Sequence, residues 1–463
     1  MKKILAVLAG ILTMLLVTAC PPGPMLSEEK EITAYSFTTA ANSALSNDVT
    51  GTISSTDISL TVPYGTAVYR LVADFPTSGA TVTANGNPQF SGNTANDFSS
   101  PATYRVTAED GTTQDYTVTV NIAATAAEEG AGFDGTASPE DTGVLTLNES
   151  SETITMVYAQ DQGSISFPAK TDDSGSATVT TKFWLAETEF TNTQAAEVLK
   201  WAYDNGRIVK TGGAHNEVNP TGVKYGTQKL IGFTQTHNRL NYYGGDFTVD
   251  SGFENHPLVR VTWYGAVMLC NWLTEMRDGH AGNLVYEGIT TNWTHTDTTE
   301  DTLKNGYRLP STDEWEYTAR YLGTTEPSTN GVLDTERKYG NDDANWTDGY
   351  YWTPGNYASG GTNNYNDMLA CREVAVYTGS DPAPLTTAPV KSLGEGSANT
   401  LGLYDMSGNV WEWCFTANGS SRILRGGGWG NNDLILQVGN VGSNFVPGDA
   451  GDYLGFRLFR TAD

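Results

Sequence analysis

The side chains best suited to nucleophilic or soft-metal chemistry in this sequence are its four cysteines. Cys20 lies near the N-terminus, and Cys270, Cys371 and Cys414 lie in the second half. Thiolates act as nucleophiles and, held close together, select Cu(I). Cys270 lies in an apolar helical pattern and Cys414 follows an aromatic run, so we expect both to be small buried hydrophobic residues. In an exported protein the last three cysteines allow one disulfide and a free thiol, or no disulfide.

The five histidines lack the spacing of a metal-binding pair. A facial iron site needs histidine and carboxylate ligands that converge on one ion. No two histidines are spaced as HxxxH, which counts against such a site, although ligands can also converge in space. The histidines are His215, His237, His256, His280 and His295.

The first 20 residues predict export and lipidation. Lys2 and Lys3 precede an apolar run over residues 4–16, which is too short to span a membrane. Residues 17–20, Val-Thr-Ala-Cys, resemble a bacterial lipobox. We therefore expect a signal peptide over 1–19 and a lipidated Cys20 that anchors the protein to a membrane. An ordinary signal peptide with an incidental cysteine is the alternative.

Length and composition predict two or three loop-rich, β-dominated domains. The chain has 463 residues, 50 of them glycine, and a formal net charge of -27 at pH 7. Because nucleic-acid binding depends mostly on Lys and Arg, this charge argues against nucleic acid as a partner. Changes in composition predict a spacer over 20–30, a first domain over 31–122, a linker over 123–150 and a second domain over 151–463.

The first domain is expected to be a small all-β sandwich. Alternating stretches at Ile58–Val62, Tyr104–Ala108 and Tyr116–Val120 are typical of strands, and Glu109–Gly111 is typical of a hairpin turn. The region resembles the cadherin-like sandwich domains of bacterial surface lipoproteins. It carries no cluster of chemically active residues, so we interpret it as a stalk or spacer.

The second domain is expected to be of the α+β class and rich in loops. Thr191–Trp201 and Thr262–Met276 have the periodicity of amphipathic helices. After Asp278 the sequence is mostly Gly-, Asn-, Tyr- and Trp-rich and predicts loops and short strands. Loops of such length are uncommon unless they are functional or tied to a compact core.

Four segments of the second domain occur in the order known from one enzyme family. They are Pro257–Trp263, Tyr307–Glu316, Gly402–Trp413 and a terminal frame, which we define as Arg422–Trp429 with Gly455–Arg460. The segments resemble the formylglycine-generating enzyme and sulfatase-modifying factor family. The resemblance implies a variant of the C-type lectin fold, poor in regular secondary structure.

Most residues of these segments are expected to hold the fold rather than to catalyse. Large indole rings bury loops that have no sheet of their own, and charge pairs pin such loops together. The residues in question are Trp315, Trp411, Trp413, Arg308, Glu314 and Glu316.

The resemblance also specifies what an active enzyme of the family requires. Its members oxidise a substrate cysteine with two cysteines that follow the Arg425–Trp429 segment and bind copper. In this sequence the enclosed segment, which we define as Gly430–Leu454, contains no cysteine. We therefore expect no oxidase activity and no required cofactor. An enzyme of the same superfamily with altered metal chemistry is the alternative.

Calcium is the one family ligand that the sequence still allows. In the enzymes, calcium sites involve the segment that matches Asp405–Glu412. Carboxylates of Asp405 and Glu412, with carbonyls of Gly408 and Val410, would supply hard oxygen ligands. A turn followed by a buried glutamate paired with an arginine is the alternative.

The composition of the enclosed segment suggests another use for the same fold. It contains no Lys, Glu, Met or Trp, and only Gln437 falls outside the residues reachable when both adenines of an Asn codon are randomised. It resembles the variable lipoproteins of diversity-generating retroelements, such as those of Treponema, with a variable region over about 425–460. We expect Gln437–Asn440 to be invariant scaffold. The positions expected to be diversified, and to bind ligand, are Gly430, Asn431, Asn432, Leu434, Ile435, Gly442, Ser443, Phe445, Gly448, Asp449, Asp452 and Tyr453.

These expectations combine into a surface lipoprotein that binds ligands without covalent chemistry. Leu434, Ile435, Phe445 and Tyr453 would be the apolar and aromatic anchors, while Gly and Asn provide room and adaptable hydrogen bonds. The partner would be a variable ligand, a protein or another cell-surface molecule, and the location the outer membrane, facing outward. A purely structural envelope lipoprotein is a further alternative.

Overall fold

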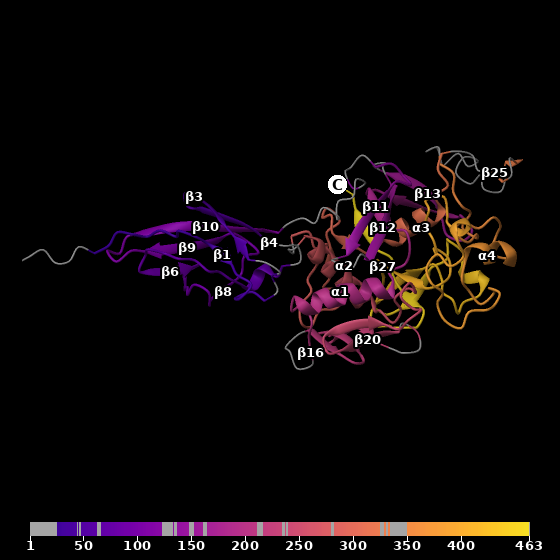
Figure 1. The fold of residues 1–463 in the computed structure, drawn as a ribbon. Coiled ribbons are helices and arrows are strands. Elements are labelled where there is room, and N and C mark those ends of the chain that lie inside the picture. Colours follow the sequence, from indigo (N-terminus) through magenta and orange to yellow (C-terminus); the bar gives the residue numbers. More distant parts are fainter. Residues whose placement is uncertain are drawn as a thin grey trace, which may run out of the picture. The chain divides into compact units, whose positions relative to one another are not determined.

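The computed structural model describes residues 26–463 except 44, 46–47, 63–65, 123–132, 134–136, 148–151, 161–163, 211–215, 234–236, 238, 279–281, 325–327, 330–331, 334–349 and 463. The expected signal peptide, Cys20 and most of the expected linker lie outside these residues. The chain divides into two compact units, one of residues up to 61 with 69–121, the other of 62–68 with 122–463 (Figure 1).

The N-terminal unit is all-β, as the strand pattern predicts. Its largest sheet has six strands in the order β3-β4-β10-β9-β6-β7, and β4 alternates between exposed and buried residues. Aromatic rings of Tyr35, Phe37, Phe75 and Tyr104 pack in its core. The strands are β1 (Ser36–Phe37), β2 (Val49–Thr50), β3 (Thr52–Ser54), β4 (Asp57–Val62), β5 (Leu71–Val72), β6 (Thr81–Ala84), β7 (Asn87–Pro88), β8 (Ala95–Asn96), β9 (Ala102–Thr107) and β10 (Thr113–Ile122), with the 3-10 helix η1 (Val68–Arg70).

The C-terminal unit contains a five-stranded sheet that holds the end of the chain. Its order is β11-β12-β15-β31-β24, so β31, from the terminal frame, pairs with strands on both sides. Phe183 of β15 stacks on Phe459 of β31 with ring centroids 5.5 Å apart. The strands are β11 (Thr142–Leu147), β12 (Glu152–Gln160), β15 (Phe183–Ala186), β24 (Tyr307–Arg308) and β31 (Phe459–Thr461).

A second sheet, in the order β29-β28-β27-β30, carries the enclosed segment. β27 (Trp411–Asn418) and β28 (Ser421–Arg425) form its antiparallel centre. β29 (Gly442–Phe445) and β30 (Leu454–Gly455) add to its two edges. The enclosed segment therefore leaves the sheet after β28 and returns to it twice.

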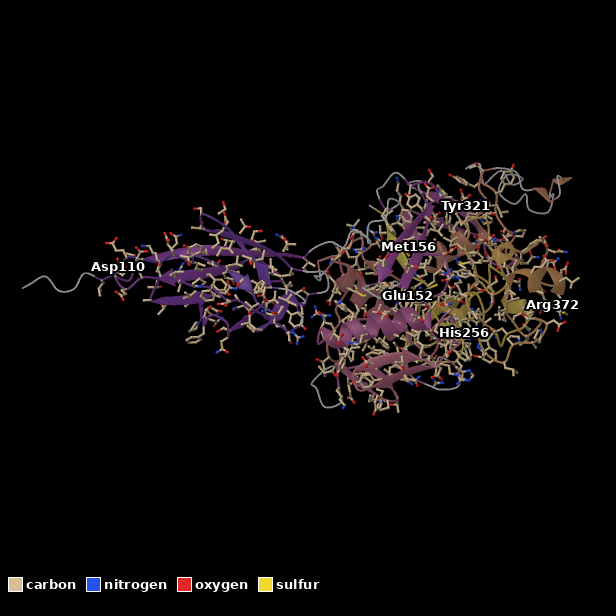
Figure 2. All side chains as sticks on the ribbon, viewed as in Figure 1. Asp110, Glu152, Met156, His256, Tyr321 and Arg372 are labelled. Atoms are coloured by element: carbon tan, nitrogen blue, oxygen red, sulfur yellow. The ribbon has the colours of Figure 1, made fainter. Side chains whose placement is uncertain are left out.

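Both expected helices are present, as α1 (Asn192–Asp204) and α2 (Trp263–Asp278). Thr191 caps α1 through a capping box with Gln194. Two further helices, α3 (Thr312–Arg320) and α4 (Met368–Val374), lie where only loops and strands were expected. Arg372 of α4 is labelled in Figure 2.

The rest of the unit consists of short pairs and turns. Within the described residues, no helix is long and apolar enough to cross a bilayer. The remaining elements are β13 (Ile165–Ala169), β14 (Gly175–Val179), β16 (Val209–Lys210), β17 (Asn216–Asn219), β18 (Gly222–Tyr225), β19 (Gln228–Gly232), β20 (Leu240–Tyr243), β21 (Asp246–Val249), β22 (Tyr286–Glu287), β23 (Thr299–Glu300), β25 (Ser328–Thr329), β26 (Val332–Leu333), η3 (Glu395–Ser397) and η4 (Asp433–Ile435).

Candidate binding surface

Most of the enclosed segment is accessible to solvent, whereas the frame on either side of it is buried. All twelve positions expected to be diversified are exposed or half-exposed, with Leu434 at 48% and Tyr453 at 39%. By contrast, residues 422–428 and 454–459 of the frame side are buried. Gln437, Val438 and Gly439, expected to be scaffold, are buried as well. The structure thus places the twelve positions on accessible parts of the chain, which are interrupted by buried residues at 436–439 and 447.

Consecutive glycines turn the chain out of β28 into this surface. Gly426 and Gly427 have φ of +89° and +79°, a backbone conformation that side chains other than Gly or Asn rarely adopt. A Cβ on Gly427 would also lie 3.0 Å from Cγ2 of Ile435. Glycine is therefore required by the backbone at 426 and 427.

The buried side chain of Arg425 supports the middle of the enclosed segment by hydrogen bonds. Its guanidinium donates to the carbonyl oxygens of Val438, at 3.3 Å, and Asn440, at 2.9 Å. It also donates to Oε2 of Glu316 at 2.6 Å and to Oγ1 of Thr312 at 2.8 Å. The contact to the enclosed segment is made to its main chain, so it does not depend on which side chains stand there.

Other scaffold residues contact the segment in the same way. Main-chain carbonyls accept hydrogen bonds whatever the side chain is. Trp411 N donates to Tyr453 O at 2.8 Å, and Trp429 Nε1 donates to Asp452 O at 3.1 Å. Further bonds of this kind run from Trp263 N to Pro447 O, Arg260 N to Gly451 O, Thr378 N to Asn431 O, Ser407 Oγ to Leu436 O and Asn418 Nδ2 to Ser443 O.

Two of the four expected anchors, Ile435 and Phe445, are partly buried and pack against the core, Phe445 next to the ring of Trp411. Three further side chains of the twelve make hydrogen bonds or ion pairs. Oδ1 of Asn431 accepts from Gly428 N at 2.9 Å, and Oδ2 of Asp449 accepts from Val446 N at 2.9 Å. Asp452 differs from the other two because its partners lie far away in the sequence. Its Oδ1 lies 2.7 Å from Arg260 NH1, and its Oδ2 lies 3.1 Å from His237 Nε2.

Several residues of this surface were not predicted from the sequence. Val441 and Val446 are exposed hydrophobic residues within the enclosed segment. His237 stacks on Trp429 with ring centroids 6.2 Å apart, and Arg260 reaches Asp452. The composition of the enclosed segment would have included the two valines, but nothing in the sequence signals the long-range contacts of His237 and Arg260.

The expected charge pairs of the frame are present and buried. Arg308 donates to both carboxylate oxygens of Glu314, at 2.8 and 2.7 Å. Glu316 pairs with Arg320 at 2.7 Å and with Arg425 at 2.6 Å. The three tryptophans expected as anchors are buried too. These residues fix the loops around the surface, as expected from their types.

The cysteines of this unit are free and buried. Cys270, Cys371 and Cys414 form no disulfide with one another, which settles the alternative left open by the sequence. Burial raises the pKa of Cys371 to about 11 and raises the pKa of Cys270 and Cys414 as well. All three thiols therefore stay protonated near neutral pH, so none is an activated nucleophile.

The two carboxylates expected to bind calcium are engaged with the protein instead. Glu412 accepts from Trp315 Nε1 at 2.7 Å and from Arg457 NH2 at 2.9 Å, and Oδ2 of Asp405 accepts from Lys391 N at 2.9 Å. The Arg457 guanidinium on Glu412 repels a cation and competes with it for the carboxylate. Within the described residues, no group of three or more His, Cys, Asp and Glu forms a metal site. Calcium at Asp405, Gly408, Val410 and Glu412 stays a prediction.

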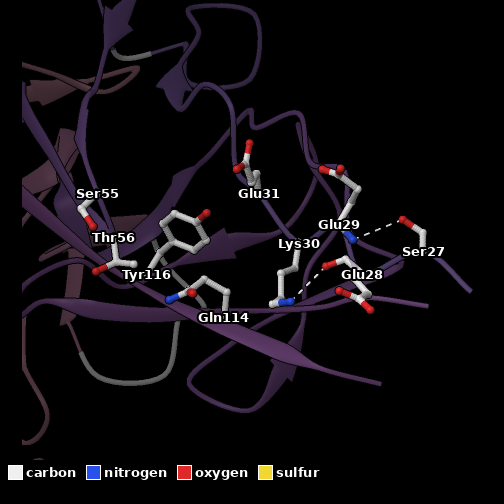
Figure 3. A pocket seen from close by; sticks show the side chains of 9 residues that line it. All are labelled: Ser27, Glu28, Glu29, Lys30, Glu31, Ser55, Thr56, Gln114 and Tyr116. Carbon is white, nitrogen blue, oxygen red and sulfur yellow. Dashed lines mark hydrogen bonds between the residues drawn. The ribbon is translucent and has the colours of Figure 1, made fainter. Parts of the chain in front are cut away.

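The N-terminal unit has an open hollow of about 670 Å³ with polar walls. Lys30 donates to Glu28 O at 3.0 Å, and Glu29 N donates to Ser27 Oγ at 3.2 Å (Figure 3). The lining polar groups thus bond to each other, and no nucleophile or metal set gathers there. The residues lining the hollow are Ser27, Glu28, Glu29, Lys30, Glu31, Ser55, Thr56, Gln114 and Tyr116.

Comparison with known proteins identifies the larger unit. The model of the sulfatase-modifying factor enzyme 1-like domain matches residues 147–462. The chain belongs to this family. The match confirms the resemblance drawn from the four sequence segments, and the loop-rich α+β class with it. The model named SGBP, N-terminal, matches residues 36–120 of the all-β unit.

The individual proteins to which the chain is similar are distant in sequence. The chain is 28% identical over 239 residues to the chaperone protein LppX of Paenibacillus barcinonensis, which covers 46% of this chain and 72% of that one. It is 27% identical over 233 residues to the formylglycine-generating enzyme of Streptomyces coelicolor, covering 46% and 55%. The match therefore spans about half of that enzyme's length.

The solved structures to which this chain is similar include a variable protein. Treponema denticola variable protein 1 is similar with a TM-score of 0.42 and 21% identity, covering 69% of this chain and 99% of that one. The U1 variant of the Major Tropism Determinant is similar with a TM-score of 0.24 and 11% identity, covering 78% and 81%.

Proposed function

We propose that this protein is a surface-anchored lipoprotein that binds a ligand non-covalently through the exposed side chains of its enclosed segment. One observation carries the proposal: the scaffold holds this segment mainly by its main chain. Arg425, Trp411 and Trp429 bond to its carbonyls and leave most of its side chains uncommitted. Such an arrangement keeps one backbone shape while the residues on it change.

The chemistry of the exposed side chains favours recognition of a protein. Leu434, Val441, Val446 and Tyr453 are large hydrophobic residues that stand in contact with water. Scattered apolar and aromatic groups of this kind form the anchors of protein interfaces when a partner excludes water from them. The ligand is therefore a protein or another cell-surface molecule, and the net charge of -27 disfavours nucleic acid.

The same surface lacks what the family's oxidase chemistry needs. Copper-dependent cysteine oxidation requires two thiolates after the Arg425–Trp429 segment, and the enclosed segment contains none. The nearest thiol in sequence, Cys414, is fully buried with a raised pKa. The function proposed is binding without catalysis, and no cofactor is required.

Lipidation of Cys20 would place this surface at the cell envelope. A lipid chain with the spacer over 20–30 tethers the soluble units to the outer membrane, facing outward. The all-β unit then acts as a stalk. We propose further that the twelve exposed positions are diversified by a retroelement, since Asn codons randomised at adenine reach nearly every residue found there.

A pair of display libraries tests the binding surface. In the first, the twelve positions are randomised together in the full chain; in the matched control, twelve buried residues of the frame are randomised to the same extent. We expect most members of the first library to be folded and selectable against an arbitrary folded protein, and few members of the control to be folded. Equal losses of folded protein in both libraries would contradict the proposal.

The gene supplies a separate test of diversification. A near-copy of the last segment downstream of the stop codon, differing mainly at adenines and close to a reverse transcriptase gene, is the expected result. Its absence from the genome would refute diversification but not ligand binding. Stoichiometric copper or iron in the purified protein would instead favour an enzyme.

A further inference from the structure

Arg260 has an unusual backbone for its residue type. Its φ of +58° lies in the left-handed region, where residues with a long side chain are strained by about 1 kcal/mol or more. Strain of this kind persists where the position has a use. The guanidinium is only partly exposed, at 31%, and NH1 contacts Oδ1 of Asp452 at 2.7 Å. Its Nε is buried and has no hydrogen-bond partner among the described residues.

A second cation lies beside this unpartnered nitrogen. A Cβ built on Gly232 would stand 2.9 Å from Lys229 Nζ and 3.4 Å from Arg260 Nε. Because Gly232 has no side chain, both nitrogens border the same small space. Lys224 lies opposite Lys229 where β18 pairs with β19, but Glu217 of β17 lies opposite Lys224 on its other side. Both lysines are exposed.

No carboxylate balances Lys229 within the part of the chain that the structure describes. Partial burial, followed by Arg260 and then Lys224, lowers the pKa of Lys229. Asp452 is turned to Arg260 NH1 and His237 instead. Like charges converge here although the protein as a whole carries a net charge of -27. Asp452 neutralises the charge of Arg260, so the groups left without a partner are the Lys229 ammonium and the Arg260 Nε–H, and an anion between them would bond to both.

We propose that Lys229 and Arg260, converging over Gly232, form a binding site for an oxyanion. The compact ammonium of Lys229 and the planar guanidinium of Arg260 both donate N–H groups, a combination that suits a carboxylate, a sulfate or a phosphate. The site consists of fixed scaffold residues at the rim of the enclosed segment, so it does not depend on the proposed function. Asp452 competes with the ligand for Arg260 and thereby tunes the affinity.

Calorimetric titration of the full chain with inorganic sulfate, inorganic phosphate and acetate, at constant ionic strength, tests the site. We expect saturable one-site binding of at least one of these anions, weakened at least tenfold in Lys229→Met. Lys210→Met is the matched control, because Lys210 is an exposed lysine on β16 of the same sheet. The Lys210→Met variant should bind the anion as tightly as the wild type does, because Lys210 is not part of the proposed site. The net negative charge of the protein opposes unspecific anion binding.

Two further variants keep the test decisive. Arg260→Gly removes the guanidinium while relieving the left-handed strain, so it should fold and lose binding. Asp452→Asn frees Arg260 NH1 and should bind the anion several-fold more tightly. A preference for acetate would point to a carboxylate of a partner, and a preference for sulfate or phosphate to a sulfated or phosphorylated one. Absence of saturable binding in the wild type and in Asp452→Asn, or equal affinities in Lys229→Met and Lys210→Met, would overturn the proposal.

Discussion

Arg425 is the side chain on which the support of the enclosed segment depends most. It is 2% exposed and donates to a carboxylate, a hydroxyl and two main-chain carbonyls. Replacing it by methionine retains an apolar stem of similar length and removes every donor. The carbonyls of Val438 and Asn440 then lose their support, and the enclosed segment is free to move.

The cost of Arg425→Met follows from what is left unpaired. Glu316 keeps its contact with Arg320 at 2.7 Å, so the buried carboxylate remains neutralised. What is lost is one charge-assisted bond, worth about 1.5–3 kcal/mol, and bonds to two carbonyls, worth about 1 kcal/mol each. We expect a fall of about 3–5 kcal/mol in the free energy of unfolding. Arg425→Lys keeps the charge but not the fork, and should lose about 1–3 kcal/mol.

Urea unfolding followed by tryptophan fluorescence measures this loss of stability in the C-terminal unit, where Arg425 lies. All 11 tryptophans lie between residues 184 and 429, so the signal reports on the C-terminal unit alone. Lys200→Ala is the control, because its ion pair with Asp204 is exposed, at 39% and 51%, and should contribute less than about 0.5 kcal/mol.

Hydrogen exchange of the full chain locates the effect of Arg425→Met. The amides of Val438 and Gly439 donate to Tyr357 O and Gly355 O, and both should lose protection in the variant. A change below about 1 kcal/mol in the free energy of unfolding, with these two amides as protected as before, would refute the reasoning that Arg425 supports the surface.

Three further predictions concern the frame and the anchor. Leu434→Ala should change the free energy of unfolding by less than about 0.5 kcal/mol, whereas the fully buried Leu436→Ala, two residues on, should lose about 2–5 kcal/mol; equal losses in urea unfolding would show that the surface is not separable from the core. Burial raises the pKa of Glu300 from its ordinary 4.5 to about 7 against the opposing charge of Arg308. The folded state therefore retains a proton that the unfolded chain loses, so stability should fall by up to about 3 kcal/mol as pH rises through this window, and Glu300→Gln should lack that fall; parallel stability curves for the two proteins would count against it. Cys20→Ala should shift the protein from the detergent phase to the aqueous phase in detergent partitioning of whole cells, and an unchanged distribution would exclude lipid anchoring through this residue.

Periodicity predicted some helices of this fold and missed others for a physical reason. α1 and α2 have apolar stripes and appear in the sequence as such. α3 buries charged residues together with aromatic ones: Glu316 and Arg320 are both nearly inaccessible and pair with each other. Buried charges interrupt the apolar stripe by which a helix is found in a sequence. Its capping box, Ser311 with Glu314, was present in the sequence and marks the start of the helix correctly.

The candidate surface divides in the same way between local and long-range information. Composition alone marked twelve accessible positions and set Gln437–Asn440 apart as scaffold. The first three of these four residues are buried and Asn440 is half-buried. It could not supply the support from Arg260, which lies 192 residues before Asp452. Contacts of that kind depend on how the residues before α2 and the enclosed segment meet in space, and no pattern in one sequence encodes them.

Exchange of side chains on this surface is not equally easy at every position. At Asn431 a substitution loses one bond from Gly428 N at the accessible surface, where water can replace the acceptor. At Asp452 a substitution removes the only carboxylate that contacts Arg260 in the described structure, and leaves Lys229 and Arg260 facing each other. Variants that lack an acid at this position should therefore bind oxyanions more tightly and be less stable in their absence. Asp452 is thus the position of the enclosed segment whose charge acts on Arg260.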